Sequence, residues 1–169
     1  MSARFGSSNV VVITGASSGI GRSTALAFAK KGARLVLAAR KKEKLDGLAR
    51  ECASLGAESI AVSVDVTDAD AVQSLAKEAV TRFGRIDVWV NNAGIGVIGS
   101  FTEIPLAEHR KVIETNLMGY IHGAYAALGV FQKQRFGTLI NNASISSRLT
   151  TPYLSSYTAS KWAIRGLSH

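Results

Sequence analysis

The sequence predicts an α/β fold in which helices cover both faces of a parallel β-sheet. Short runs rich in Val and Ile recur between longer helical patterns, which is typical of βαβ units. The expected strands are apolar along nearly their whole length, as strands covered on both faces must be. A glycine also falls just after each of the first three expected helices, where it can end a helix in a left-handed conformation; these glycines are Gly32, Gly56 and Gly84.

The expected elements alternate along the chain. Apolar runs predict strands at residues 9–14, 34–39, 59–65, 86–91 and 137–143. Apolar positions at helical spacing predict helices at residues 19–31, 42–55, 68–83 and 106–134, followed by a last helix that begins near Ser155. Asp68 is expected to cap the third helix. Because βαβ crossovers are right-handed, we expect a doubly wound sheet with strand order 3-2-1-4-5 and ligands beyond the carboxyl ends of its first and fourth strands.

Composition limits the class of protein. A chain of 169 residues suits one domain, and 47% hydrophobic residues with only 2 Pro argue for a packed globular core. No apolar run reaches the roughly 18 residues that a transmembrane helix needs, so we expect a cytoplasmic protein without a membrane partner. The net charge is +8, but the 20 Lys and Arg are spread along the helices, which argues against a nucleic-acid partner.

The sequence predicts no metal site. The single cysteine, Cys52, lies in a helical pattern and is interpreted as structural. No cluster of His, Cys and Asp has the spacing of metal ligands, because the histidines are isolated from one another; they are His109, His122 and His169. Trp89 and Trp162 are interpreted as packing residues and not as base-stacking platforms.

A glycine-rich turn follows the first expected strand and runs directly into the first expected helix. Residues 14–21 read TGASSGIG. Gly15 permits the tight turn, Gly19 lets the backbone approach a pyrophosphate, and Gly21 allows close packing of helix on strand. The pyrophosphate would meet the unpaired N–H groups at the positive end of the helix. A turn without a ligand is the alternative, but the strand before it and the helix after it favour a dinucleotide site of the Rossmann type, with Ser17, Ser18 and Ile20 as further contacts.

The spacing of these glycines resembles that of the short-chain dehydrogenase/reductase family. Two further segments are similar to the same family. Asn91-Asn92-Ala93-Gly94 ends the fourth expected strand, where small residues would let the loop approach the nucleotide and amide side chains would tie strands together. Asp65-Val66 ends the third strand, and the resemblance implies that this acid contacts the adenine amino group. Beyond the glycine turn, the expected coenzyme contacts are therefore Asp65, Val66, Asn92, Ala93 and Gly94.

The end of the second expected strand bears on the choice of coenzyme. An NAD-binding protein usually offers an Asp or Glu to the ribose hydroxyls here, whereas this chain has Ala39 and Arg40. The guanidinium of Arg40 could pair with a 2′-phosphate, which favours NADP(H) over NAD(H). The alternative is a solvated Arg at the start of a helix. Ser18 stands where the family often has a second basic residue.

Tyr157 and Lys161 are the candidate acid/base pair. Residues four apart on a helix lie on the same face, and an ammonium beside a phenol lowers the pKa of the phenol towards neutral proton transfer. Alone, Tyr-x-x-x-Lys is common by chance and favours an ordinary helix face. It has two companions that match the family's Ser and Asn: Ser144 lies 13 residues before Tyr157, and Asn116 lies in the long preceding helix.

The resemblance implies a reaction and a role for each of these residues. A hydride would move between the nicotinamide C4 and the carbon of a small-molecule carbonyl or alcohol substrate, while Tyr157 exchanges a proton with the substrate oxygen. Ser144 would orient that oxygen, Lys161 would also hold the nicotinamide ribose, and Asn116 would place a water that links Lys161 to solvent. An alternative from another class is a nucleotide-binding or regulatory module that keeps the site without turnover.

The resemblance also bears on organisation. Family members continue beyond this length, so we expect residues 1–169 to form a single dinucleotide-binding and catalytic domain that lacks the C-terminal substrate-binding segment and the later strands. The family usually forms homodimers or homotetramers through its two long helices. The apolar stretch at residues 119–131 fits such an interface.

Overall fold

The computed structural model describes Gly6 and residues 8–169. In this part of the chain the strands form one parallel sheet: β1 (Val10–Thr14), β2 (Arg34–Ala39), β3 (Ser59–Ser63), β4 (Val88–Asn91) and β5 (Thr138–Asn141). Their order is β3-β2-β1-β4-β5, which confirms the predicted doubly wound topology. The winding direction reverses between β1 and β4, so the crevice expected for a ligand lies beyond the ends of these two strands.

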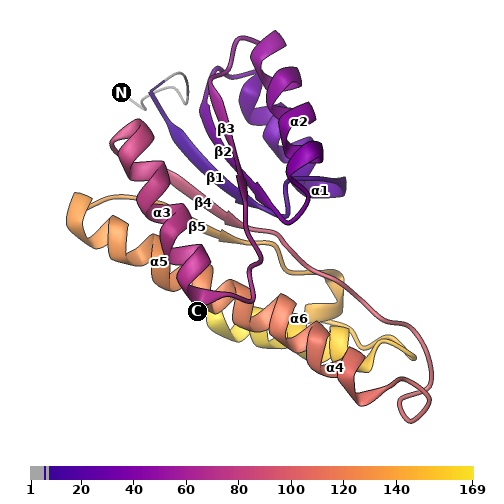
Figure 1. The fold of residues 1–169 in the computed structure, drawn as a ribbon. Helices are drawn as coiled ribbons and strands as arrows, with labels where there is room; N and C mark the ends of the chain where they lie inside the picture. Colours follow the sequence, from indigo (N-terminus) through magenta and orange to yellow (C-terminus); the bar gives the residue numbers. More distant parts are fainter. Residues whose placement is uncertain (1–5, 7) are drawn as a thin grey trace.

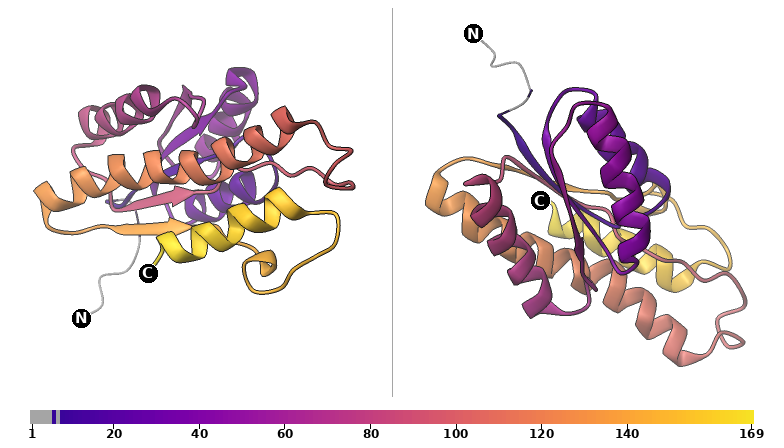
Figure 2. Two further views of the ribbon diagram at one scale, coloured as in Figure 1. Left: turned by 90° about the horizontal axis from the view of Figure 1, so that it is seen from below. Right: turned by 45° about the horizontal axis from the view of Figure 1, so that its top comes forward.

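Helices cover both faces of this sheet (Figures 1 and 2). On one face lie α1 (Gly19–Ala29) and α2 (Lys42–Ser54), and on the other lie α3 (Ala69–Phe83) and α5 (Gly119–Gln134). Two more helices, α4 (Leu106–Ile113) and α6 (Ser155–Leu167), pack against each other beyond the carboxyl ends of the strands. None of the helices within the described residues is both long and apolar enough to cross a bilayer.

The core has two layers, one on each side of the sheet. Val10 and Val12 of β1 face the layer under α3 and α5, whereas Val11 and Ile13 face the layer under α1 and α2. All four are fully buried, and each such side chain contributes about 1.5–3 kcal/mol. Cys52 belongs to the second layer. Burial raises the pKa of its thiol, which keeps it protonated and supports the structural interpretation.

The predicted burial is wrong at two places. Strands covered on both faces were expected throughout, but β3 is only half-buried and β5 alternates between exposed and half-buried positions, because both lie at sheet edges. Ile140 of β5 is 42% exposed. Trp89 is fully buried, as expected of a packing residue, whereas Trp162 is 44% exposed on α6.

Most helix boundaries follow from local signals. Gly32, Gly56 and Gly84 have φ angles of 77°, 83° and 79°, which is the left-handed conformation expected after a helix. The carboxylate of Asp68 accepts hydrogen bonds from the backbone N–H groups of Asp70 and Ala71, both at 3.0 Å, so it caps α3.

The long helix expected at residues 106–134 is interrupted. Between α4 and α5 lies a π-helical turn, η1 (Glu114–Met118), and a short 3₁₀ turn, η2 (Ile145–Ser147), follows β5. A π-turn adds a residue to one turn of a helix and often marks a functional position. It contains Asn116, whose side chain is completely buried.

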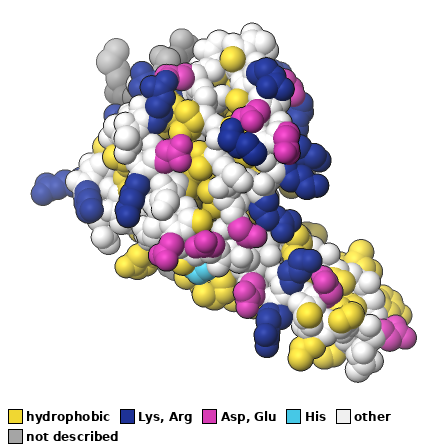
Figure 3. Space-filling model, viewed as in Figure 1, with side chains coloured by type: hydrophobic (Ala, Val, Ile, Leu, Met, Phe, Trp, Pro, Cys, Tyr) yellow, Lys and Arg dark blue, Asp and Glu magenta, His cyan; other side chains and the backbone are white. Residues whose placement is uncertain are grey.

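The surface is mixed in charge. In the view of Figure 3, basic and acidic side chains are interspersed over the helices, as the spread of Lys and Arg along the sequence indicated.

Candidate active site

A cleft of about 830 Å³ opens at the carboxyl ends of the strands, where the doubly wound topology places a ligand. Loops after all five strands contribute to it, together with α6. The structure brings most of the predicted site residues to its wall, and these are Gly15, Ser17, Ser18, Gly19, Ile20, Arg40, Asp65, Val66, Asn92, Ala93, Gly94, Ser144, Tyr157 and Lys161. Of the predicted residues, Gly21 and Asn116 lie behind the wall.

The glycine turn is built for close backbone approach. Gly15 has a φ of 65°, and a Cβ on it would lie 2.7 Å from the Cα of Ala93. A Cβ on Gly21 would lie 2.3 Å from the carbonyl oxygen of Gly15, so this glycine packs α1 against the turn instead of lining the cleft. Ser18 makes no side-chain cap on α1, and the first turn of α1 holds no acidic residue. The N–H groups of that turn therefore remain available to an anion.

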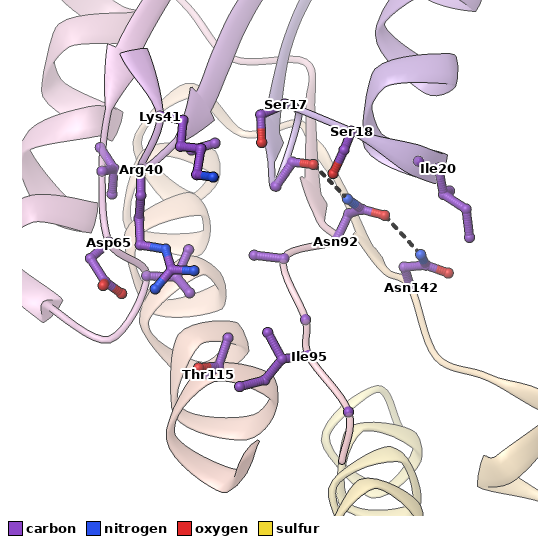
Figure 4. Close-up of a pocket in the computed structure, with 18 of the residues that line it drawn as sticks. Ser17, Ser18, Ile20, Arg40, Lys41, Asp65, Asn92, Ile95, Thr115 and Asn142 are labelled. Atoms are coloured by element: carbon purple, nitrogen blue, oxygen red, sulfur yellow. Dashed lines mark hydrogen bonds between the residues drawn. The ribbon is translucent and has the colours of Figure 1, made fainter. Parts of the chain in front are cut away.

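Amide side chains tie the turn to the loops after β4 and β5. Asn92 donates from Nδ2 to the carbonyl oxygens of Thr14 (3.1 Å) and Gly15 (3.3 Å). Asn142 in turn donates from Nδ2 to Oδ1 of Asn92 at 2.9 Å, and Figure 4 shows this chain of amides along the cleft. The floor of the cleft is thus held by hydrogen bonds that cross three strands.

Asn142 is a site residue that sequence reasoning missed. A signal was present, because Asn-Asn-Ala occurs both at 91–93 and at 141–143. In the sheet Asn91 pairs with Asn141, and the amide of Asn91 donates to Oδ1 of Asn141 at 2.9 Å. The repeat places equivalent amides on neighbouring strands, which a one-dimensional reading does not reveal.

One end of the cleft is cationic. Arg40, Lys41 and Lys44 line it, all three are exposed, and none has an ion-pair partner among the residues that the structure describes. Lys42, between them in sequence, points elsewhere and pairs with Asp46. Figure 4 shows Arg40 and Lys41 beside the cleft. Sequence reasoning selected only Arg40, although the two lysines follow it within one helical turn.

At the other end, Lys161 is buried against carbonyl and aromatic groups. Its ammonium donates to the carbonyl oxygen of Asn142 at 2.9 Å, and it lies 5.6 Å from the ring centre of Tyr157 and 5.3 Å from that of Tyr120. The side chain is only 4% exposed, and this desolvation lowers the pKa of Lys161 to about 8. The two rings offer their negative faces to the ammonium in its charged form.

Tyr120 is a second residue that sequence reasoning missed. Its hydroxyl donates to the same oxygen of Asn142 at 3.0 Å, so one carbonyl accepts from both Tyr120 and Lys161. Burial, with a smaller contribution from Tyr157, raises the pKa of Tyr120. It therefore stays a neutral donor. The signal available in the sequence was only an aromatic residue in an apolar helix.

Asn116 joins two elements of the site from behind. Its Oδ1 accepts from the N–H of Ile95 at 2.8 Å, and its Nδ2 donates to the carbonyl of Ile95 at 2.9 Å and to Oγ of Ser160 at 3.0 Å. Ser160 then donates to the carbonyl of Tyr157 at 2.6 Å. The amide thus fixes the loop after β4 relative to the turn of α6 that carries Tyr157.

The remaining residues of this end surround the phenol. The oxygen of Ser144 accepts from the N–H of Ser146 at 3.1 Å while the side chain lines the cleft. A Cβ on Gly96 would lie 3.4 Å from Cδ2 of Tyr157, so the loop after β4 runs against the ring. Further lining residues that sequence reasoning did not select are Ile95, Gly96, Thr115 and Ala143.

No group of three or more His, Cys, Asp or Glu that could hold a metal comes together in residues 6 and 8–169.

Known proteins resemble this chain in sequence. Residues 9–169 match the short chain dehydrogenase family. An uncharacterized oxidoreductase of Listeria monocytogenes is 38% identical over 158 residues, which cover 94% of this chain and 64% of that protein. The chain thus spans just under two thirds of that relative's length.

Solved structures are similar over nearly the whole chain. One is an alcohol dehydrogenase from the archaeon Thermococcus sibiricus, complexed with 5-hydroxy-NADP. It matches with a TM-score of 0.90 at 36% identity, and the match covers 94% of this chain and 68% of that protein. A short chain dehydrogenase/reductase from Burkholderia phymatum, in complex with NAD, has a TM-score of 0.92 at 35% identity, with coverages of 95% and 57%. The fold, the family match and these likenesses agree, and the chain belongs to the short-chain dehydrogenase/reductase family.

Proposed function

We propose that residues 1–169 form the dinucleotide-binding and catalytic domain of an oxidoreductase that transfers a hydride between NADP(H) and a carbonyl or alcohol substrate. One observation carries this proposal. The cleft that contains the glycine turn also contains Tyr157 with the buried ammonium of Lys161 beside it. A general acid and a dinucleotide cradle in one cleft are what this chemistry requires.

The cleft fits a nicotinamide coenzyme. Residues 15 and 17–20 would hold the pyrophosphate. The turn at Gly15 leaves a space that a Cβ would fill, and the N-terminus of α1 has no side-chain cap, so both suit this group. Asp65 and Val66 would bind the adenine side, and residues 92–94 would support the dinucleotide from the loop after β4. Lys161 and Tyr157 would hold the nicotinamide ribose. When bound, the coenzyme supplies or accepts the hydride at its nicotinamide C4.

A preference for NADP(H) follows from the cationic end of the cleft. Arg40 offers a planar fork of donors that matches a phosphate, and Lys41 and Lys44 add two charges at the same wall. The half-buried neighbour, Ala39, offers no carboxylate to the ribose hydroxyls of NAD(H). The two solved relatives described above bind one coenzyme each, so the preference rests on this chain's own residues.

The proton chemistry belongs to Tyr157. In reduction its phenol would give a proton to the substrate oxygen as the substrate carbon receives the hydride, and in oxidation it would take that proton back. Ser144 would hold the same oxygen by a hydrogen bond. The ammonium of Lys161, still charged at neutral pH with a pKa of about 8, would stabilise the phenolate that remains.

Substitution of the phenol tests this function. NADPH oxidation with a panel of ketones should fall by about 10²- to 10⁴-fold in Tyr157→Phe, while the affinity for NADPH, measured by fluorescence, should fall far less, because the Tyr157 hydroxyl is only one of many proposed coenzyme contacts. Tyr125→Phe, at a position 75% exposed on α5, is the matched control. Equal turnover in Tyr157→Phe would overturn the assignment. NADPH binding without turnover of any ketone would instead support a nucleotide-binding or regulatory module.

Self-association is part of the same proposal. Along α5, Tyr125 is 75% and Leu128 is 46% exposed, which leaves apolar surface on one side of a long helix. We expect a homodimer or homotetramer through this surface. Light scattering on the eluting protein measures its mass, and Leu128→Glu should shift it towards the monomer.

A further inference from the structure

The two ends of the cleft differ in charge. The nucleotide end carries three cationic side chains, whereas the loops beside Tyr157 are almost free of charge. Residues 92–102, after β4, contain no charged residue, and residues 141–157, after β5, contain only Arg148. Lys161 is nearly fully buried and already donates to the carbonyl of Asn142. A substrate carboxylate or phosphate would therefore find few charged partners beside Tyr157.

These two loops, in which Arg148 is the only charged residue, expose large apolar side chains. Ile98 is 77%, Ile145 is 68%, and both Leu149 and Tyr153 are 62% exposed. We call these four residues the apolar rim. Figure 3 shows hydrophobic side chains, with some charged ones among them, at the lower right end of the molecule, which α4 and the neighbouring loops form. The four residues do not line the cleft themselves, but their loops contain residues that do, such as Gly96 and Ser144. Apolar surface collected on loops beside a cleft is typical of a ligand-binding surface.

The rim is held in place and joined to the cleft. Ile145 directly follows Ser144, which lines the cleft, and the N–H of Leu149 donates to the carbonyl of Ile145 at 3.1 Å. The N–H of Gly99 donates to the carbonyl of Tyr153 at 3.0 Å and so connects the two loops. Tyr153 has a φ of 65°, a left-handed conformation that a bulky residue adopts rarely and keeps only where its surroundings impose it.

We infer that the substrate of this site is an uncharged ketone or secondary alcohol with a bulky apolar group, and that the apolar rim holds that group beside Tyr157. The inference rests on the function proposed above and adds the substrate class to it. An apolar group placed on the rim leaves water together with the rim side chains, which favours binding without any charged partner. Anionic ketones of the same size lose solvation there, and within residues 92–102 and 141–157 the only charged side chain is that of Arg148.

Binding and turnover of a matched pair of ketones test the inference separately from the function. The probes are 2-acetylnaphthalene and 6-acetyl-2-naphthoate, which differ by one carboxylate. Saturation-transfer NMR on the chain with NADP⁺ reports binding, and NADPH oxidation reports turnover. We expect the neutral ketone to bind about tenfold or more tightly than the carboxylate. Equal binding of both probes, preference for the carboxylate, or binding of neither would overturn the inference.

The outcomes for binding and turnover are distinguishable. If the neutral ketone binds preferentially and is not reduced, the substrate class stands as a binding preference and the proposed oxidoreductase function fails. If ketones are reduced but the carboxylate is the better substrate, the function stands and the inference fails.

Two substitutions locate the binding surface. Leu149→Ser and Tyr153→Ser should each weaken binding of 2-acetylnaphthalene by about tenfold while the affinity for NADPH is retained. Leu55→Ser is the control, because Leu55 is 41% exposed at the far end of α2 and outside both loops. Retained binding in both rim variants would show that the apolar group lies elsewhere and would overturn the role of the rim.

Discussion

The two ends of the cleft are constructed differently. The nucleotide end consists largely of backbone, with a glycine turn and an open helix N-terminus, and three of the side chains that line it are exposed cations. The end around Tyr157 consists of side chains that are buried and hydrogen-bonded, such as Lys161 and Asn116. A backbone site should be sensitive to any added Cβ, whereas a side-chain site should be sensitive to the loss of single polar atoms. The following experiments test that difference.

The largest effect is expected at Gly21. In Gly21→Ala the new Cβ meets the backbone carbonyl of Gly15, which cannot rotate away. We expect the free energy of unfolding to fall by about 2–3 kcal/mol and coenzyme affinity to fall as well. Urea denaturation and NADPH fluorescence measure these. Gly129→Ala on α5, where a Cβ meets nothing within 4 Å, should instead raise stability by about 0.5–1 kcal/mol. If Gly21→Ala and Gly129→Ala changed the free energy of unfolding by similar amounts, the close packing at the turn would be contradicted.

The cations at the nucleotide end should affect coenzyme choice without affecting the fold. Arg40→Ala should weaken NADPH binding by about 2 kcal/mol and leave NADH binding nearly unchanged, because only NADPH carries the 2′-phosphate. Lys44→Ala should act in the same direction with a smaller effect. Lys42→Ala is the matched control, since Lys42 is paired with Asp46. An equal loss of NADPH and NADH affinity in Arg40→Ala would remove the proposed preference.

At the other end, Lys161 should give a pH signature. Burial lowers the pKa of Lys161 from 10.5 to about 8, so between about pH 8 and pH 10.5 the unfolded chain holds a proton that the folded chain has released. The unfolded state then binds more protons, and this group raises stability as pH rises through that window. Lys161→Met should lose this rise and be more stable at pH 7 by on the order of 2 kcal/mol.

The measurement is urea denaturation at pH 7 and pH 9.5 for the parent, Lys161→Met and the exposed control Lys133→Met. Cys52 and Tyr120, whose pKa values are raised, titrate with the opposite sign, so the comparison is made between variants and not within one profile. Parallel profiles for the parent and Lys161→Met would show that the ammonium is not desolvated.

The smallest effect is expected from one hydroxyl. Tyr120→Phe keeps the ring beside Lys161 and removes the hydrogen bond to Asn142, so stability should fall by about 1 kcal/mol. Tyr125→Phe on the same helix should stay within about 0.5 kcal/mol of the parent, because the ring is kept and the Tyr125 hydroxyl, unlike that of Tyr120, makes no hydrogen bond within the described residues. Denaturation of both variants under one condition decides whether a single oxygen matters at this end.

Local patterns were sufficient for most of the fold. The strand order, the glycines that end helices and the cap at Asp68 follow from short segments whose preferences agree with the final structure. The ends of β3 and β5 were predicted too long. Residues 64–66 and 142–144 leave the sheet because they turn to line the cleft. Apolar content alone does not show where a strand stops pairing.

The site was only partly predictable for a related reason. Residues with a sequence motif were found, whereas Lys41, Lys44 and Asn142 were missed because each becomes a site residue through its place in space. The π-turn that carries Asn116 depends on the packing of α4 and α5 around it, so it has no short sequence signal.

The sequence by itself determined the class of fold, the glycine turn and the spacing of Tyr157 and Lys161, because these depend on residues close together in the chain. Only the tertiary structure decided that Lys161 is buried with a lowered pKa and shares the carbonyl of Asn142 with Tyr120. It also decided that exposed cations line one end of the cleft and that the loops beside the other end expose apolar side chains. Burial and electrostatic environment are properties of surfaces assembled from distant segments, and a linear pattern does not contain them.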